Sequence, residues 1–248
     1  MNDSSTSTAC VLLIGNELLS GKTQDLNLSF LGSELAKLGI ELVEARVIRD
    51  QHDTIAAHVN ECREKYTYVF TTGGIGPTHD DITSESIARA FAKPLEVHAD
   101  ALGRMQSGRG ELNEARMKMA RVPAGASLID NPISKAPGFR IENVFVLAGI
   151  PKIARAMFAS AIAELTPGKT ILSASIDVFA SEGDIAGPLE HIAQNWPAVQ
   201  IGSYPFARDG QFGANLVVRG TDEALITEVI EEIMQAMTEL DGKPERAS

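Results

Sequence analysis

Short runs of apolar, β-branched and aromatic residues alternate with longer stretches of helical periodicity in the first part of the chain. The runs at 11–14, 40–48 and 66–71 have the composition of buried strands. In the stretches between them, apolar residues recur every three or four positions, which is the spacing of one helix face. Strand and helix therefore alternate, and this order predicts an α/β domain with a mostly parallel sheet and helices on its faces.

Individual residues mark the expected ends of several elements. A helix over 26–38 should end at Gly39, because glycine readily adopts the left-handed conformation that closes a helix. Asp53 is a candidate N-cap of the next helix. A further buried strand is expected at 144–147, and Pro151 after it suits the first position of a helix.

The segment 94–123 is less regular. It predicts two helical pieces separated by a turn at 107–110. Arg116, Lys118 and Arg121 follow as a basic cluster. These side chains could attract a phosphate, but a solvated helix face explains them equally simply and is the expectation favoured here.

The dipeptide Pro167-Gly168 marks the boundary between two predicted domains, 9–166 and 169–242. Beyond it, apolar and polar residues alternate at 172–178, as in a half-buried strand. A helix, a hairpin with its turn around 208–210 and a strongly amphipathic last helix follow. The order β-α-β-β-α predicts a small α+β domain.

The segment TTGGIGPTHDDIT, residues 71–83, connects an expected strand to an expected helix. Gly73, Gly74 and Gly76 permit a tight turn and leave main-chain N–H groups uncovered by side chains. An anion bound there would also meet the positive end of the following helix. We therefore expect this segment to bind a phosphate group.

Two acids in the same segment change this picture. Asp80 and Asp81 would repel a nearby phosphate by roughly 4 kcal/mol at 4 Å, whereas the helix end offers about 0.3–1 kcal/mol. A divalent cation between carboxylate and phosphate oxygens turns this repulsion into attraction. Mg²⁺ is the usual ion with such ligands. The alternative is structural, because Thr78-x-x-Asp81 has the form of a capping box.

A second polar loop follows the first strand. Gly15, Glu17, Asp25 and Asn27 lie in GNELLSGKTQDLN, at a strand end expected on the same side of the sheet as Gly73. These side chains could add oxygen ligands to a shared crevice. A loop acid and a helix cap would explain Glu17 and Asp25 without any function, and both interpretations stay open.

Composition narrows the class of protein. The 248 residues include 33 acidic and 22 basic residues, a net charge of −11, which disfavours nucleic acid and anionic membranes as partners. Residues 1–8 form a polar tail without the basic start of a signal peptide. No apolar run has the length of a membrane span.

Cysteine and histidine usage suggests neither a disulfide nor a zinc site. Cys10 and Cys62 both fall in core patterns, so we expect free buried thiols and a cytoplasmic protein. The five histidines form no metal-binding pair on a helix face. His79, inside the glycine-rich segment, is expected to be a solvated loop residue.

Several motifs in this order resemble those of one known family. They are Gly15-x-Glu17-Leu18 with Gly21, Asp25 and Asn27; TTGGIGPTHDDIT; Asn131-Pro132 to Ala136-Pro137-Gly138-Phe139; and Gly149-Ile150-Pro151. The sequence is similar to the molybdopterin-binding, MoaB/Mog-like domain in the branch found at the N-terminus of competence/damage-inducible CinA proteins. The motif IGSYPF, residues 201–206, is similar to the segment that follows this domain in eukaryotic FAD synthases.

The resemblance implies a three-layer α/β/α fold, a phosphorylated nucleotide-like or pterin-like ligand, and a homo-oligomer. It implies that Asp80 and Asp81 hold the metal and take part in catalysis. The other implied ligand-binding residues come from the matched motifs: Thr72, Gly73, Gly74, Gly76, Thr78, Gly15, Glu17, Asp25, Asn27, Asn131, Pro137, Gly138, Gly149 and Pro151.

Three functions follow from the resemblance. The CinA and FAD-synthase branches imply metal-dependent cleavage of a nucleotide pyrophosphate such as ADP-ribose or FAD. Mog-type relatives imply adenylylation of molybdopterin, for which Phe139 or Asn131 could contact the pterin. Two departures, Ala148 for a proline and Ile153 for a glutamate, favour a third possibility if that glutamate binds metal: ligand binding without catalysis. Because the sequence ends at Ser248, the amidase activity of full-length CinA is not expected.

Overall fold

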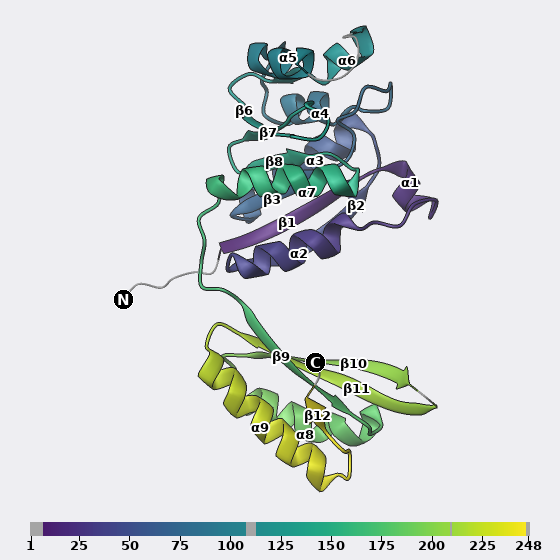
Figure 1. Ribbon diagram of the computed structural model, residues 1–248, viewed down its shortest axis with the longest axis vertical. Coiled ribbons are helices and arrows are strands. Elements are labelled where there is room, and N and C mark those ends of the chain that lie inside the picture. Colours follow the sequence, from purple (N-terminus) through teal and green to yellow (C-terminus); the bar gives the residue numbers. More distant parts are fainter. Residues whose placement is uncertain (1–6, 108–112, 209, 247–248) are drawn as a thin grey trace. The chain divides into compact units, whose positions relative to one another are not determined.

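The computed structural model describes residues 7–107, 113–208 and 210–246 and divides into two compact units, Met1–Gly168 and Lys169–Ser248 (Figure 1). Most of the expected polar tail lies outside the described residues. The same holds for most of the expected turn at 107–110 and for Asp209 in the expected hairpin turn.

The first unit is built on a six-stranded sheet with the order β2-β1-β3-β8-β7-β6. Its first four strands in this order are parallel, and β7 runs antiparallel to both of its neighbours. The strands are β1 (Ser7–Ile14), β2 (Ile40–Ile48), β3 (Tyr68–Thr72), β6 (Ser127–Ile129), β7 (Gly138–Ile141) and β8 (Val144–Leu147). The expected mostly parallel α/β sheet is confirmed.

Helices cover both faces of this sheet. Along β1, Cys10 and Leu12 pack with α3 and α4, whereas Val11 and Leu13 pack with α2 and α7, because successive side chains of a strand point to opposite faces. The helices are α2 (Asn27–Lys37), α3 (His52–Lys65), α4 (Thr83–Ala90) and α7 (Pro151–Ala161), the last continuing into a 3-10 turn, η1 (Ile162–Glu164). The result is the expected three-layer arrangement.

Smaller elements complete the first unit. A short helix, α1 (Asn16–Leu19), follows β1. The irregular segment forms β4 (Leu95–Val97), α5 (Ala99–Gln106), α6 (Glu114–Lys118) and β5 (Arg121–Pro123), which matches the two expected helical pieces. β4 and β5 pair as a separate antiparallel ribbon, and Met105 lies in a small core of its own with Ala101 and Ala120.

Two expected boundaries are wrong. Ser7 and Thr8, placed in the polar tail, belong to β1, because they pair with the start of β2. Asp53 is not the N-cap of α3; Gln51 takes that position and Asp53 lies in the first turn of the helix. The expected stop at Gly39 is confirmed, with φ 68°.

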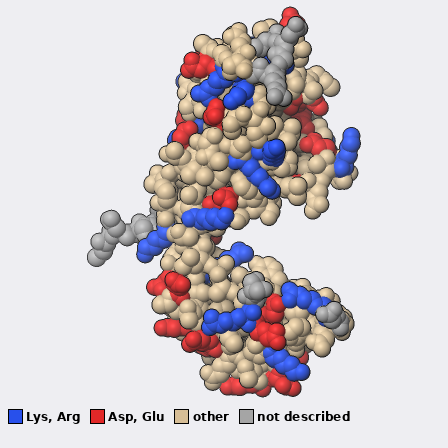
Figure 2. All heavy atoms as spheres, in the orientation of Figure 1, with Lys and Arg blue, Asp and Glu red and all other residues tan. Residues whose placement is uncertain are grey.

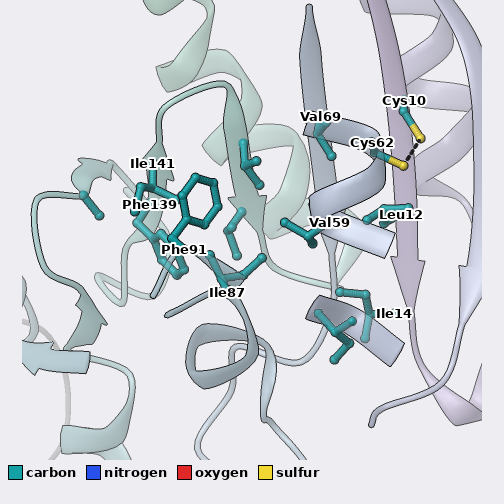
Figure 3. Packing of buried hydrophobic residues seen from close by; sticks show 14 of the residues in the cluster. Cys10, Leu12, Ile14, Val59, Cys62, Val69, Ile87, Phe91, Phe139 and Ile141 are labelled. Atoms are coloured by element: carbon teal, nitrogen blue, oxygen red, sulfur yellow. Dashed lines mark hydrogen bonds between the residues drawn. The ribbon is translucent and has the colours of Figure 1, made fainter. Parts of the chain in front are cut away.

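Two cysteines meet in the core between β1 and α3 (Figure 3). The Sγ atoms of Cys10 and Cys62 lie 3.4 Å apart, and both residues are fully buried. Both are free thiols, as expected. The hydrogen bond to Cys62, with burial second, raises the pKa of Cys10, so this thiol keeps its proton.

The second unit is a small α+β domain with a sheet in the order β10-β11-β9-β12. Its elements are β9 (Leu172–Val178), α8 (Glu182–Asn195), β10 (Gln200–Arg208), β11 (Gln211–Gly220), α9 (Glu223–Glu239) and β12 (Glu245–Arg246). Both helices pack on the sheet face that carries Ile176 and Leu216. Trp196, at the end of α8, packs against this core and donates a hydrogen bond from Nε1 to Glu232 Oε2 at 2.6 Å.

Charged side chains are mixed on the molecular surface. On the face that Figure 2 shows, lysines and arginines of the described residues are scattered among acids instead of forming one continuous basic area. Within the described ranges, no helix combines the length and apolar character needed to cross a membrane.

Candidate functional site

Loops that follow the parallel strands meet at one edge of the first unit's sheet. Two main-chain hydrogen bonds join neighbouring strand ends, from Gly15 N to Ile48 O and from Gly73 N to Leu147 O, each 3.2 Å long. The carboxyl ends of parallel strands are where ligands bind in such sheets. The loops at this edge are residues 15–26, 49–51, 148–150 and the glycine loop, residues 73–82.

Close main-chain contacts explain why glycine stands at the start of the glycine loop. Gly73 has φ +105°, and a Cβ atom there would lie 2.1 Å from the carbonyl oxygen of Ile14. A Cβ at Gly149 would lie 3.2 Å from the Cα of Gly73. The ends of β1, β3 and β8 can therefore approach one another only because these positions lack side chains.

The glycine loop presents main-chain donors. The N–H of Gly73 bonds Leu147 and is used by the fold. The next three N–H groups, of Gly74, Ile75 and Gly76, have no hydrogen-bond acceptor among the described residues. Successive unpaired N–H groups on a turn are suited to bind an anion, which is the role expected for this loop. Thr72, by contrast, is the buried last residue of β3.

Asp81 closes the turn inside this loop. Its Oδ2 accepts a hydrogen bond from the main-chain N of Thr78 at 2.8 Å and another from the Thr78 hydroxyl. The structural alternative, a capping box of α4, does not hold, because α4 begins only at Thr83, with Ile82 as its N-cap. Asp81 therefore shapes the loop and does not cap the helix.

Asp80 points to solvent next to this turn, with 65% of its side chain exposed. The neighbouring Thr78 hydroxyl lowers the pKa of Asp80, helped by the main-chain N–H of Asp80 itself. Asp80 is thus a charged carboxylate that can accept a cation. His79 is 97% exposed, as expected of a solvated loop residue.

Asp50 joins the site, although the sequence analysis did not single it out. It follows β2 at the same edge, and its Oδ2 accepts a hydrogen bond from Asn16 N at 2.7 Å. Partial burial raises the pKa of Asp50, and the nearby charges of Glu17 and Asp80 raise it further. Arg49 separates Asp50 from the end of β2, so a rule that selects the residue directly after each parallel strand, as for Gly15 and Gly73, does not find it.

Glu17 and Asp25 lie in the segment after β1, and Asn27 is the first residue of α2. The Glu17 carboxylate lies against Gly15, where an added Cβ would be 2.5 Å from Oε1. Asp25 Oδ1 accepts a hydrogen bond from Leu28 N, in the first turn of α2, at 2.8 Å, although Leu26 takes the N-cap position. Asn27 donates from Nδ2 to Gly149 O at 2.9 Å and ties this loop to the one after β8. Its Oδ1 is buried and accepts no hydrogen bond from any of the described residues.

Residues from the remaining motifs lie at the same edge but serve mainly the fold. Asn131 uses its side chain within its own turn, accepting from Ile133 N and donating to Ala136 O. Gly138 begins β7, where a Cβ would lie 2.4 Å from Val146 O; Pro137 beside it is buried. Pro151 is the first residue of α7, next to the exposed Gly149.

The residues proposed to contact a pterin are not free to do so. Phe139 is 1% exposed and belongs to the core under α3 and α4, so its ring offers no stacking surface. The amide of Asn131 is occupied by its own turn. Ile153, in the first turn of α7, packs against the opposite core and leaves no carboxylate at that position.

The acids suit a cation that binds together with phosphate. Within the part of the chain that the structure describes, no three His, Cys, Asp or Glu side chains are grouped closely enough to hold a metal by themselves. Mg²⁺ commonly uses one or two protein carboxylates and completes its shell with phosphate oxygens and water. The exposed carboxylate of Asp80, with Asp50 near it, fits that mode of binding.

Fold and site together define an α/β domain whose loops meet at the carboxyl ends of its parallel strands. Residues 10–167 match the family model described as a probable molybdopterin binding domain, and the chain belongs to this family. Residues 170–241 match the model described as the middle domain of FAD synthase. The family and the fold support binding of a small-molecule ligand.

Individual relatives agree with this assignment. A protein of Aeropyrum pernix is 35% identical over 210 residues, which cover 79% of this chain and 78% of that protein. A probable FAD synthase of Caenorhabditis elegans is 32% identical over 261 residues, and the match covers 94% of this chain but 50% of the relative. The crystal structure of the protein CinA from Thermoplasma acidophilum superposes with a TM-score of 0.60 at 32% identity, over 64% of this chain and 99% of that one. The expected resemblance to CinA proteins and FAD synthases is confirmed.

Proposed function

We propose that the protein hydrolyses the pyrophosphate bond of a nucleotide of the ADP-ribose or FAD type with the help of a divalent metal ion. The observation that carries this proposal is the glycine loop, where three unpaired N–H groups, of Gly74, Ile75 and Gly76, lie within a few residues of the charged Asp80. An anion site beside a carboxylate is electrostatically unfavourable for phosphate alone. With a cation between them, the carboxylate and the phosphate can both coordinate the same metal ion.

The chain's own residues have separate roles in this reaction. The loop N–H groups bind the phosphoryl oxygens and stabilise the charge that develops on them. Asp50 accepts a proton from the attacking water, because partial burial and the charges of Glu17 and Asp80 raise its pKa and make it a stronger base than an ordinary aspartate. The water oxygen bonds to phosphorus, the bond from phosphorus to the bridging oxygen breaks, and that oxygen leaves with the second phosphate.

The metal would be held by Asp80, and when bound it would neutralise charge on the phosphate oxygens. Asp81, expected from the sequence as a second ligand, contributes by keeping the Thr78 turn closed. Ile153 in place of the family glutamate leaves Asp50 and Asp80 as the acids on which catalysis depends.

Hydrolysis and metal dependence are tested separately. Purified protein is incubated with ADP-ribose, FAD and NADH in the presence of Mg²⁺, Mn²⁺ or Co²⁺, and AMP is measured. Isothermal titration with ADP, with and without Mg²⁺, then measures binding. Equal affinity in both conditions would contradict the shared metal, and no AMP with any metal would leave ligand binding without catalysis as the function.

Molybdopterin adenylylation is the competing function. The burial of Phe139 and the occupied amide of Asn131 remove the two side chains proposed to contact a pterin. Complementation of a strain that lacks the molybdopterin adenylyltransferase tests this alternative, and growth on a molybdoenzyme-dependent substrate would favour it. The homo-oligomer and the cytoplasmic location expected above are part of the proposal and are checked by light scattering and cell fractionation.

A further inference from the structure

Lys118 reaches the glycine loop from a distant part of the chain. It is the last residue of α6, and its Nζ donates a hydrogen bond to Thr78 O at 2.6 Å, across 40 positions of sequence. The sequence favours a solvated helix face for Lys118, Arg116 and Arg121. The structure instead places the half-buried side chain of Lys118 against the loop.

Thr78 links this lysine to the rest of the site. The same residue donates its N–H to Asp81, and its carbonyl oxygen also receives the N–H of Asp81 at 3.3 Å. The ammonium group has three donors, of which Thr78 O uses one. The positive charge also lies close enough to Asp80 and Glu85 to lower the pKa of both carboxyl groups, although hydrogen bonds to these acids have larger effects.

The positive charge of Lys118 can offset part of the negative charge of the acids in the site. The negative charges of Glu17 and Asp80 lie close enough to Asp50 to raise its pKa, although partial burial has the largest effect. A phosphate approaching the glycine loop is repelled by these charges unless cations offset them. Lys118 contacts the same loop and keeps two N–H donors beyond the one that binds Thr78 O. It can offset part of the repulsion and form charge-assisted hydrogen bonds to phosphate oxygens.

We propose that Lys118 binds a phosphoryl oxygen of the ligand, with the Thr78 carbonyl holding the ammonium in place before the ligand arrives. This inference rests on the proposed function, because it assigns a residue to the phosphate part of that site. Lys118 then determines affinity for the phosphate groups of the ligand and not for its nucleoside part.

The test compares Lys118→Met and Lys118→Arg with Lys93→Met, a control at an exposed lysine after α4. Titration calorimetry measures the Kd of ADP and of adenosine in the presence of Mg²⁺, and thermal unfolding is measured alongside. Loss of one charge-assisted hydrogen bond should weaken ADP binding roughly ten- to a hundredfold in Lys118→Met. Lys118→Arg should keep most of the affinity, and neither Lys118→Met nor Lys93→Met should change adenosine binding.

The other possible outcomes distinguish failure of the Lys118 inference from failure of the proposed function. If wild type binds ADP and Lys118→Met binds it equally well, the role of Lys118 is overturned and the proposed function stands. If Lys118→Met loses affinity for ADP and adenosine alike and melts earlier, Lys118 only supports the Thr78 turn, and the inference is again overturned. If wild type binds no ADP and releases no AMP, the proposed function fails first and Lys118 has no phosphate to bind.

Discussion

The main-chain N–H of Asn16 donates a hydrogen bond to Asp50 Oδ2 at 2.7 Å and joins the ends of β1 and β2 across 34 positions of sequence. This bond stabilises the charged carboxylate, yet partial burial and the neighbouring Glu17 and Asp80 oppose it more strongly and raise the pKa of Asp50. The fold therefore holds an acid where its charge is disfavoured. Such positions are typical of functional groups.

Replacing Asp50 with asparagine should separate stability from activity. In the folded state the pKa of Asp50 lies above its ordinary value of 3.8, so its stabilising contribution is present below that value and is lost as the pH rises through the folded-state pKa. Asp50→Asn should therefore melt at a higher temperature than wild type at pH 7.5, with a smaller difference at pH 4. AMP release should fall by roughly 10²-fold or more, the usual effect of losing a general base.

Asp53→Asn is the control for this experiment, because Asp53 is exposed in the first turn of α3 and lies outside the site. It should retain full activity. An Asp50→Asn protein with wild-type activity would remove Asp50 from the mechanism. A melting difference that shrank toward neutral pH would contradict the direction of the pKa shift.

Adding one methyl group at Gly73 should disrupt the strand ends. The new Cβ would lie 2.1 Å from Ile14 O, at φ +105°, so both steric overlap and backbone strain oppose Gly73→Ala. We expect a loss of roughly 3 kcal/mol or more in the free energy of unfolding. Gly21→Ala shares the positive φ, +71°, but meets nothing within 4 Å, and should cost about 1 kcal/mol. Urea unfolding of both variants measures the difference, and equal midpoints would contradict the close approach of β1 and β3.

The two neighbouring aspartates should respond differently to truncation. Asp81→Ala removes both hydrogen bonds that Thr78 donates. It should lower the free energy of unfolding by about 1 kcal/mol and weaken ADP binding. Asp80→Ala removes an exposed carboxylate, so stability should stay close to wild type while the Mg²⁺ dependence of ADP binding is lost. Thermal unfolding and calorimetry on both variants distinguish these roles. Retained Mg²⁺ dependence in Asp80→Ala would exclude Asp80 as a metal ligand.

Most of the fold could be predicted from sequence because it depends on local patterns. The strands at 40–48 and 144–147 were placed to the residue, since their composition and their flanking turns agree. The alternation of strand and helix fixes a parallel sheet with covered faces. The first residues of β1 were missed because Ser7 and Thr8 are polar and join the sheet by pairing with β2, while Thr8 also exchanges hydrogen bonds with Thr67.

The site was predictable only where its chemistry lies within one segment. Gly73, Gly74 and Gly76 are consecutive enough to be recognised, and the structure explains the first of them by contact with Ile14. Asp50 and Lys118 each enter the site from another element, so no local pattern identifies them. Phe139 shows the opposite error, because an aromatic residue within a motif turned out to be core.

The paired thiols of Cys10 and Cys62 supply one more prediction. They are the chain's two cysteines, both are fully buried, and their Sγ atoms are 3.4 Å apart. An alkylating reagent should therefore modify the native protein only as fast as the region around β1 and α3 opens. Mass spectrometry at increasing urea concentrations follows this labelling. Modification of the native protein at the rate of an unstructured peptide would contradict the burial.

The single tryptophan, Trp196, belongs to the second unit. The protein consequently contains a separate natural reporter for each of its two units. The cysteines of the first unit are read by mass, and the tryptophan of the second is read by fluorescence. Whether the two units unfold together or in sequence can be determined on the natural sequence, with no engineered probe, no ligand and no knowledge of its substrate.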